Sequence, residues 1–261
     1  MTAEMGELIV HLEAETAVLR TQLDALDPGS FSLPTPAEGW TILDQVTHLA
    51  FFDEVATATL EDPDRFAAHV ASAATLGDRY VDDVALRHRA LAPELALEWF
   101  DAARGGLRTA LLRATPSGRV AWFGPSMSVA SLLTSRIMET WAHGQDVFDA
   151  LGVPHPVTDA LGDVAFLCAR TRQNSYEVRG RTAPTVAVSV ELDAPTGATW
   201  RFGDGEVAIR GDAIEFCLVA TQRRHVDATS LRWSSAEARE WLELAQAFAG
   251  PPGAGRRVAA K

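Results

Sequence analysis

The chain has 261 residues, which is enough for one large domain or two modest ones. Its hydrophobic residues make up 47% of the sequence, so it can build a substantial core, and its formal net charge is −12. This acidity argues against nucleic acid and anionic membranes as partners, because phosphate groups are bound by basic surfaces. The acidic N-terminus and the lack of a long apolar run predict a cytoplasmic protein. Cys168 and Cys217 lie in apolar segments without a paired metal spacing, so we expect them to be buried.

The first 150 residues predict a bundle of about four long helices with connecting loops. Apolar residues recur at helical spacing over residues 4–26, and Asp27-Pro28-Gly29 ends that segment. Thr41 is typical of an N-cap and Asp44 of its capping-box partner, so a second helix is expected over residues 42–60. The polar stretch that follows, residues 61–92, has irregular breaks at Pro63 and Gly77, and segments such as residues 80–90 have a helical pattern.

Two more long helices complete the predicted bundle. One begins at Pro93 and ends before Pro116, and the other covers about residues 128–150 and stops at Gly152. The adjacent pair Gly105-Gly106 lies inside the first of these helices. Each glycine costs about 1 kcal/mol relative to alanine in a helix, so close helix packing or a bend is expected there.

Beyond residue 153 the pattern changes to one further helix followed by short strands, which indicates a small α+β domain. The expected elements are a helix at 158–175, strands at 185–192, 199–202 and 206–210, hairpin turns at 194–197 and 203–205, and helices at 212–221 and 235–249. The whole chain is therefore predicted to be mostly α with a small α+β part. The expected segments are a helical bundle (1–152), a connecting helix and linker (153–182), the small domain (183–250) and a flexible tail (251–261).

Three polar residues in the helical half form a candidate metal site. Glu139 and His143 are four residues apart on one predicted helix, so their side chains leave the same face, and His48 lies on another. Two imidazoles and one carboxylate are a known ligand set for a catalytic divalent metal that keeps a position open. An alternative is that Glu139 and His143 belong to a solvated stripe with Arg136 and Asp146. His48, among apolar residues, also fits a hydrogen-bonded core histidine.

Two stretches of sequence resemble a known family. Gly39-Trp40-Thr41 followed by Gln45-Val46-Thr47-His48-Leu49 is similar to the second-helix motif of DinB-like metal-binding bundles. Residues 122–127 (WFGPSM) together with 138–146 (METWAHGQD) resemble the mycothiol-dependent maleylpyruvate isomerase superfamily. The resemblance implies an antiparallel four-helix bundle followed by a small C-terminal α/β domain. It also implies that His48, Glu139 and His143 are the metal ligands.

The resemblance assigns roles to further residues. In that family an arginine of the small domain can bind the substrate or the thiol cofactor, and Arg223 is the nearest candidate, although Arg224 would serve equally. The residues expected to form an apolar wall beside the site, or else ordinary core, are Trp40, Trp122, Phe123 and Met127. The residues expected to accept a hydrogen bond from a ligand imidazole, or else to be surface charges, are Asp44 and Asp146.

Three functions are compatible with these features. The first is a metal-dependent enzyme that activates mycothiol or a similar thiol for isomerisation or S-transfer on a small electrophilic substrate. The second is a thiol-independent metal enzyme of specialised metabolism, an isomerase, cyclase or lyase. The third is a non-catalytic metal-binding or ligand-sensing module. Zn²⁺ is the default ion, while Ni²⁺, Fe²⁺ and Mn²⁺ suit the same ligand types. We expect a small-molecule partner and a monomer or homodimer.

Overall fold

The computed structural model describes residues 4–253 and 255, and the chain divides into two compact units, residues 1–158 and 159–261. The first unit extends beyond residue 152 because His155 and Thr158 contact Glu15 of the first helix. The expected flexible tail, residues 251–261, falls largely outside the described residues. None of the helices in the described part of the chain combines the length and the apolarity that a bilayer crossing needs.

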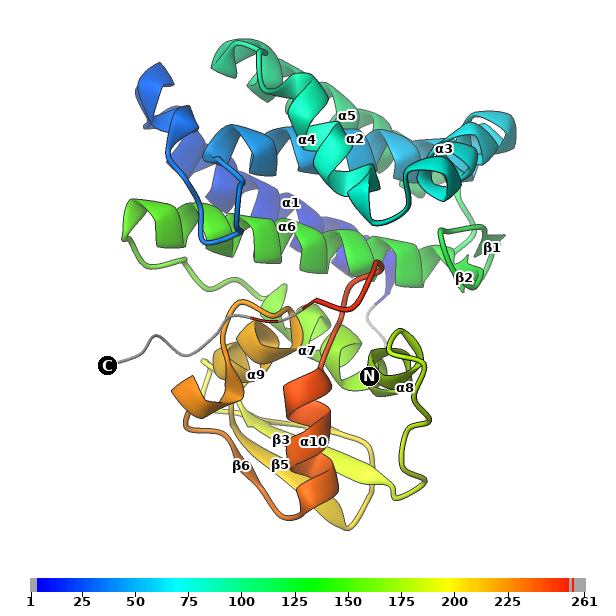
Figure 1. Cartoon of the computed structure of the whole chain (residues 1–261), viewed down its shortest axis with the longest axis vertical. Coiled ribbons are helices and arrows are strands. Elements are labelled where there is room, and N and C mark those ends of the chain that lie inside the picture. Colours follow the sequence, from blue (N-terminus) through cyan, green and yellow to red (C-terminus); the bar gives the residue numbers. More distant parts are fainter. Residues whose placement is uncertain (1–3, 254, 256–261) are drawn as a thin grey trace. The chain divides into compact units, whose positions relative to one another are not determined.

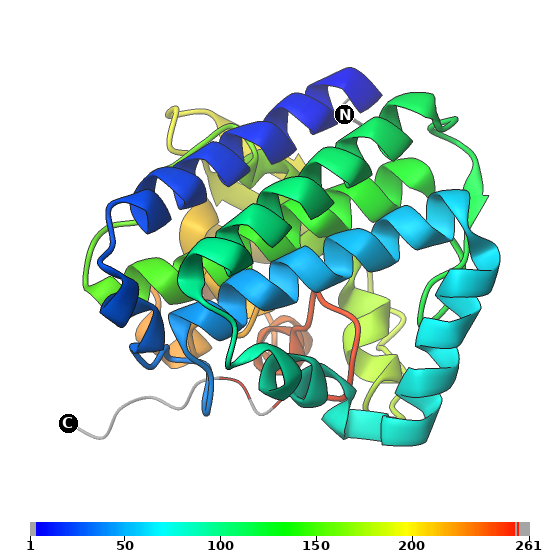
Figure 2. The ribbon, with the colours of Figure 1, turned by 90° about the horizontal axis from the view of Figure 1, so that it is seen from above.

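The first unit is a bundle built from α1 (Met5–Asp24), α2 (Ile42–Glu61), α5 (Pro93–Arg113) and α6 (Val129–Leu151). Figure 2 shows these helices running side by side, and α2 packs against both α5 and α6 while α1 packs against α6. The shorter α3 (Pro63–Leu76) and α4 (Tyr80–His88) connect α2 to α5 (Figure 1). The remaining elements of the unit are the 3₁₀ turns η1 (Pro28–Ser32) and η2 (Gly77–Arg79) and the strands β1 (Arg119–Val120) and β2 (Met127–Ser128).

The long helices begin and end where the sequence predicts. The Thr41 hydroxyl accepts from the amide of Asp44 and the Asp44 carboxylate accepts from the amide of Thr41, so the capping box is confirmed. Pro93 occupies the first turn of α5, where its missing N–H costs nothing. Gly152 ends α6 with a left-handed backbone, φ 67°, which glycine adopts without a steric penalty.

Two expectations for the bundle are wrong. Residues 63–76 form a regular helix because Asp62 caps it and Pro63 lies in its first turn, where proline favours a helix rather than breaking one. Close packing does not explain Gly105 and Gly106, because both are exposed and a Cβ atom on either would have no heavy atom within 4 Å.

Among the residues that the structure describes, two groups of packed apolar side chains stand out in the bundle. The larger lies between α1, α2, α5 and α6 and includes Leu19, Leu23, Ile42, Leu49, Phe100 and Val147. The second lies where α2, α3, α4 and the β1–β2 loop meet and is rich in aromatic rings. We call it the aromatic cluster, and it comprises Phe51, Phe52, Phe66, Tyr80, Trp122 and Phe123. Because α2 contributes buried side chains to both groups, its position against the neighbouring helices is fixed.

The second unit is a small sheet with helices. Its elements are α7 (Leu161–Arg170), α8 (Arg172–Glu177), β3 (Val188–Asp193), β4 (Thr199–Phe202), β5 (Val207–Asp212), α9 (Ala213–Ala220), η3 (Val226–Ala228), β6 (Arg232–Trp233) and α10 (Ala236–Leu244). The strand order is β4-β3-β5-β6, with β3 and β5 parallel and the other neighbours antiparallel. Cys168 and Cys217 are free thiols buried in this unit, as expected.

The predicted hairpin turn at residues 203–205 is wrong. Residues 194–197 do join β3 and β4 as a hairpin, but the chain then crosses the start of β3 and enters β5 on its far side. The crossing brings the backbone so close that a Cβ on Gly203 would overlap the carbonyl oxygen of Val188, and one on Gly205 would overlap Ala187. The glycines therefore serve a close backbone approach, which local sequence patterns do not distinguish from a tight turn.

Two other differences concern the end of the second unit. The last helix, α10, ends at Leu244 instead of residue 249, and the following chain leaves the helical path to hydrogen-bond with Ala220 through Ala247. The two-residue strand β6 carries no alternating pattern and was not predicted. Both features depend on contacts with distant segments, so local periodicity does not reveal them.

Candidate metal centre

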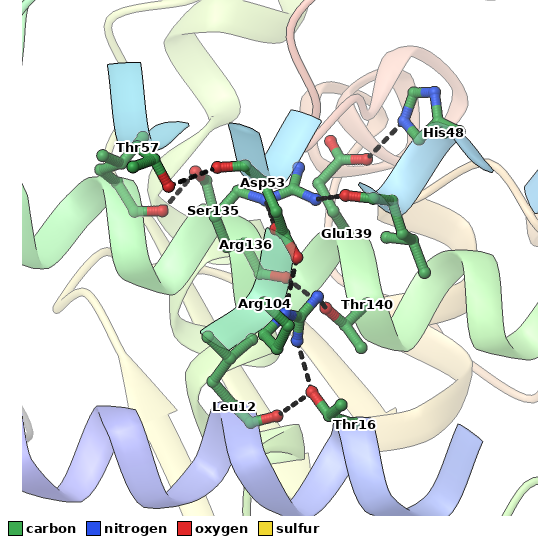
Figure 3. A network of polar contacts seen from close by, with 12 residues as sticks. Leu12, Thr16, His48, Asp53, Thr57, Arg104, Ser135, Arg136, Glu139 and Thr140 are labelled. Carbon is green, nitrogen blue, oxygen red and sulfur yellow. Dashed lines mark hydrogen bonds and ion pairs between the residues drawn. The ribbon is translucent and has the colours of Figure 1, made fainter. Parts of the chain in front are cut away.

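Two neighbouring helices of the bundle bring His48, Glu139 and His143 together. His48 comes from α2, and Glu139 and His143 lie one turn apart on α6; one nitrogen or oxygen of each residue lies within 4.8 Å of the others. The Glu139 Oε2 atom is 3.7 Å from His48 Nε2 and 3.1 Å from His143 Nε2. Figure 3 shows the His48–Glu139 contact. The distant segments that the sequence singled out therefore meet at one point.

The cluster is sheltered rather than solvated. The exposed fractions of the His48, Glu139 and His143 side chains are 8%, 20% and 11%. Arg136 and Asp146, which would share a solvated stripe with them, are only 2% and 1% exposed. The solvated-face alternative is therefore wrong, because α6 is covered on the side of its polar residues as well as on its apolar side.

A directed chain of hydrogen bonds orients His143. The hydroxyl of Thr35 donates to the carbonyl of Trp40 (3.0 Å), and the amide nitrogen of Gln45 donates to the Thr35 hydroxyl oxygen (2.8 Å). The Gln45 oxygen is then free to accept from His143 Nδ1 (2.5 Å). This assignment places the proton of the neutral imidazole on Nδ1 and leaves the Nε2 lone pair directed toward Glu139.

The charge states suit a cation at this point. Burial, together with the charge of the nearby His143, lowers the pKa of the His48 imidazole to about 3, so His48 is neutral at pH 7. Burial alone would raise the pKa of Glu139, but the adjacent imidazoles of His143 and His48 and the charge of Arg136 hold it well below its usual range. The result is an ionised carboxylate beside the neutral imidazole of His48.

This donor set fits a divalent metal. Nitrogen lone pairs and a carboxylate that face one another at 3.1–3.7 Å repel unless they share a cation. Imidazole nitrogen and carboxylate oxygen are ligands that Zn²⁺ and related ions accept. The Nδ1 atom of His48 is buried and, unlike that of His143, has no hydrogen-bond partner in the described residues. The residues present therefore fit the metal that the sequence suggested.

A buried ion network, which sequence reasoning missed, fixes the two ligand-bearing helices. Asp53 of α2 is 0% exposed and accepts hydrogen bonds from Arg104 Nε (2.6 Å) and Arg136 Nε (3.0 Å), as Figure 3 shows. Arg104 also donates to Thr140 of α6 (3.0 Å). The sequence feature that could have revealed this network is Asp53, a charged residue in the otherwise apolar segment that follows His48. A buried charge of this kind requires a partner.

Aromatic rings lie on one side of the cluster. The ring centroid of Trp40 is 5.2 Å from that of His48 and 6.0 Å from that of His143. Phe52, which we did not select from the sequence, is closer still, at 4.6 Å from His48. The ring of Phe123 meets that of Phe52 edge-to-face, with the centroids 6.2 Å apart, so Phe123 is linked to the site through Phe52.

The other two residues of the expected apolar wall lie farther out. Trp122 contacts Phe123 and Phe66 within the aromatic cluster. Met127 pairs with Val120 in the β1–β2 hairpin, before the start of α6. Tyr80 belongs to the aromatic cluster, and its buried hydroxyl has no hydrogen-bond partner among residues 4–253.

The two aspartates differ in their surroundings. The Asp44 carboxylate accepts from the amide and hydroxyl of Thr41 and from Arg89 Nε (3.1 Å), so it serves the helix cap instead of contacting His48. Asp146 is buried at 1% exposure. The imidazole of His143 has Gln45, an uncharged residue, as its acceptor.

The two candidate arginines belong to the second unit. Arg223 follows the end of α9, where its Nη1 donates to the carbonyl of Thr221 (2.9 Å). The neighbouring Arg224 donates its backbone amide to the carbonyl of Leu218. The choice between these two arginines therefore stays a matter for experiment.

The fold and the cluster define a helical bundle that presents a His-Glu-His set from two adjacent helices and could hold a metal ion. Residues 12–148 match the family model described as the mycothiol maleylpyruvate isomerase N-terminal domain, and the chain belongs to this family. It is 43% identical over 258 residues to uncharacterised proteins from two strains of Mycobacterium tuberculosis, a span that covers 97% of this chain and 100% of theirs.

Two crystal structures share the fold. They are of the mycothiol-dependent maleylpyruvate isomerase, one of them a histidine-to-alanine mutant, and each has a TM-score of 0.60 and 18% sequence identity with this chain. The match to the mutant covers 85% of this chain and 90% of that one, and the match to the other covers 89% and 93%. The bundle followed by a small α/β part, expected from the sequence, is therefore confirmed.

Proposed function

We propose that this protein is a metal-dependent enzyme that uses a low-molecular-weight thiol of the mycothiol type for isomerisation or S-transfer on a small electrophilic substrate. The observation that carries the proposal is the meeting of His48, Glu139 and His143 within 4.8 Å in a sheltered part of the bundle. Membership of the mycothiol maleylpyruvate isomerase family supports the thiol. Zn²⁺ is the expected ion.

Three protein ligands are the number that catalytic zinc sites use, with a further position left for water or substrate. A bound Zn²⁺ ion would supply Lewis acidity and lower the pKa of a thiol or water at that position. His48, Glu139 and His143 would hold the ion. The remaining residues of the site act by orienting these ligands and by shaping the space around them.

The protein's own contribution is preorganisation. Gln45 holds the His143 imidazole with its Nε2 lone pair directed into the site. Arg136, anchored by Asp53, adds a positive charge that favours the ionised carboxylate of Glu139. Trp40 and Phe52 cover the imidazoles with apolar surface, which excludes water and suits a flat, unsaturated substrate.

A thiol such as mycothiol also needs polar contacts away from its sulfur. Arg223 is the residue that we assign to this role, because a guanidinium binds carboxylate and other oxygen acceptors through paired N–H groups. Arg224 is the neighbouring candidate. The variants Arg223→Gln and Arg224→Gln separate them, since only loss of the true contact should weaken thiol binding.

Elemental analysis of the purified protein tests the metal site. Wild-type protein reconstituted with Zn²⁺ and then desalted should hold close to one equivalent, and the His143→Ala variant should hold almost none, because two ligands cannot retain the ion through desalting. His225→Ala is the matched control, since His225 lies in the second unit and outside the cluster. Unchanged zinc content in His143→Ala would reject the ligand assignment.

A thermal-shift titration tests the thiol. Mycothiol should raise the melting temperature of the zinc-loaded protein, whereas its S-methyl derivative should not, because methylation removes the thiol proton and the sulfur can no longer bind as a thiolate. If both compounds act alike or neither acts, the thiol part of the proposal fails, and a thiol-independent metal enzyme or a non-catalytic module becomes the better description. Zinc content is measured in the same samples, so the two parts of the proposal are judged separately.

A further inference from the structure

The second unit contains a cavity that plays no part in the proposed metal site. Its volume is about 330 Å³, and it lies among α7, the β3–β4 edge of the sheet and α10. The apolar part of its lining includes Phe166, Phe202, Trp241 and Val190. The strand register sets Val190 opposite Phe202, so both side chains face the same side of the sheet. The cavity is therefore walled by aromatic and aliphatic surface that the fold itself positions.

Two guanidinium groups also line this cavity. Arg170 stands over the ring of Phe166 with its Cζ 5.5 Å from the centroid, and Arg172 stands 5.9 Å from the centroid of Trp241. Stacking on aromatic faces holds both cations at the apolar surface. The cavity thus combines a flat hydrophobic wall with fixed positive charge, which is unusual in a chain whose net charge is −12.

Neither guanidinium has a carboxylate partner in the described part of the chain. Arg172 donates only to the carbonyl oxygens of Val186 (3.1 Å) and Pro184 (3.0 Å), and its Nε is buried without any hydrogen-bond partner. A buried donor that finds no acceptor carries a desolvation cost, and this cost is larger for a charged group. An anionic oxygen from outside the protein would remove that cost at Arg172 and would pair with the exposed guanidinium of Arg170.

We propose that this cavity binds an organic monocarboxylate with an aromatic or compact apolar body. A water molecule occupies about 30 Å³ in the liquid, so a volume of about 330 Å³ corresponds to a ligand of roughly ten non-hydrogen atoms. Inorganic phosphate would satisfy Arg170 and Arg172 but leave the aromatic wall wet. A neutral hydrocarbon would cover the wall but leave both cations unpaired. A carboxylate on an apolar body would pair with the arginines and also cover the aromatic wall.

The test uses isothermal titration calorimetry of the full chain with 3-phenylpropionate as the probe, 3-phenylpropanamide as its uncharged counterpart and inorganic phosphate as the anion without an apolar body. We expect saturable binding of 3-phenylpropionate and at least tenfold weaker binding of the other two. Equal affinity for the amide would overturn the role of the arginines, and absence of saturable 3-phenylpropionate binding would overturn the site itself.

Variants then place the binding in this cavity. Arg170→Gln should weaken 3-phenylpropionate at least tenfold, while Arg201→Gln should bind like wild type, because Arg201 precedes Phe202 on β4 and points to the opposite face of the sheet. Ala169→Phe should abolish binding by filling the cavity, since Ala169 lines it. Arg170 and Arg201 are exposed, so these substitutions leave the core intact.

The metal cluster offers a second place where a carboxylate could bind. The His143→Ala variant distinguishes the two, because none of the three clustered residues lines the cavity. We expect His143→Ala to retain 3-phenylpropionate binding. Loss of binding in that variant, or unchanged binding in Ala169→Phe, would place the ligand elsewhere and refute the proposal. The outcome does not depend on whether the proposed thiol-dependent function is correct.

Discussion

Replacing Asp53 by asparagine should destabilise the bundle more than any comparable change at its surface. The Asp53 carboxylate is fully buried and accepts from Arg104 at 2.6 Å and Arg136 at 3.0 Å, and these arginines are 7% and 2% exposed. The asparagine oxygen can still accept from one guanidinium, but its NH₂ group then faces the other. The variant therefore leaves two buried cations without the carboxylate that they share.

The magnitude follows from the contacts. A hydrogen bond to a charged group contributes about 1.5–3 kcal/mol, and removing one partner of a buried ion pair costs about 3–5 kcal/mol. Since one of the two contacts survives in Asp53→Asn, we expect the free energy of unfolding to fall by about 3 kcal/mol. The same change should reduce zinc retention, because Asp53 joins α2 and α6, which carry the clustered residues.

Urea unfolding followed by circular dichroism measures the effect. The matched control is Asp101→Asn, which removes another aspartate–arginine contact between helices. The Asp101 carboxylate lies 3.0 Å from Arg20 Nε, but Asp101 is 51% exposed, so its loss should cost at most about 1 kcal/mol. If Asp53→Asn were no more destabilising than Asp101→Asn, the two buried arginines would not depend on Asp53, and the reasoning would fail.

Three further predictions concern single side chains. Gln45→Leu should weaken zinc binding about 10- to 100-fold in a competition titration, because it removes the acceptor that orients His143; equal affinity would mean that the hydrogen bond has no role in ligand orientation. Gly105→Ala should raise the free energy of unfolding by about 0.5–1 kcal/mol, since Gly105 is helical and a Cβ there meets no atom; a loss of stability would contradict this. Tyr80→Phe should stabilise the protein by about 1 kcal/mol at pH 8, because it removes a buried hydroxyl that has no partner in residues 4–253. Burial raises the pKa of Tyr80 to about 12, so the unfolded chain ionises first and the advantage of Tyr80→Phe should grow as the pH rises above 10; a constant difference would refute it.

Much of the first unit was visible in the sequence because its signals are local. The capping box at Thr41, the proline at position 93 and the glycine after α6 each act on the backbone within one turn. The long helices therefore begin and end close to where they were predicted. Only α3 was missed there, because Pro63 favours a helix start and was interpreted as a break.

The fold of the second unit was harder to predict from the sequence, because the order of its strands depends on contacts between segments far apart in the chain. The glycines at 203 and 205 were interpreted as a turn from their local pattern, whereas the parallel pairing of β3 with β5 requires a crossing over the start of β3. Likewise, nothing in the neighbourhood of Trp241 indicates that it shares a cavity with Phe202. Such pairings are decided by which surfaces bury best together.

In the candidate site, too, local features could be predicted from the sequence and contacts across the bundle could not. The spacing of Glu139 and His143 on one helix follows from helical geometry alone, so the sequence could pair them. His48 could be nominated from its motif, but its distance from Glu139 could not be derived. The acceptor Gln45 and the anchor Asp53 were not anticipated, since each meets its partner across the bundle.

The sequence by itself determined the helices of the bundle, the acidic charge and the three residues able to ligate a metal, because these depend on composition and on contacts within a few residues. Only the tertiary structure decided that the three residues meet, that Arg136 and Asp146 are buried, and that the cavity in the second unit is lined by two arginines with no carboxylate partner in the described residues. The physical reason is that burial and ion pairing arise between segments far apart in the chain, where the packing of whole helices and strands sets which side chains meet.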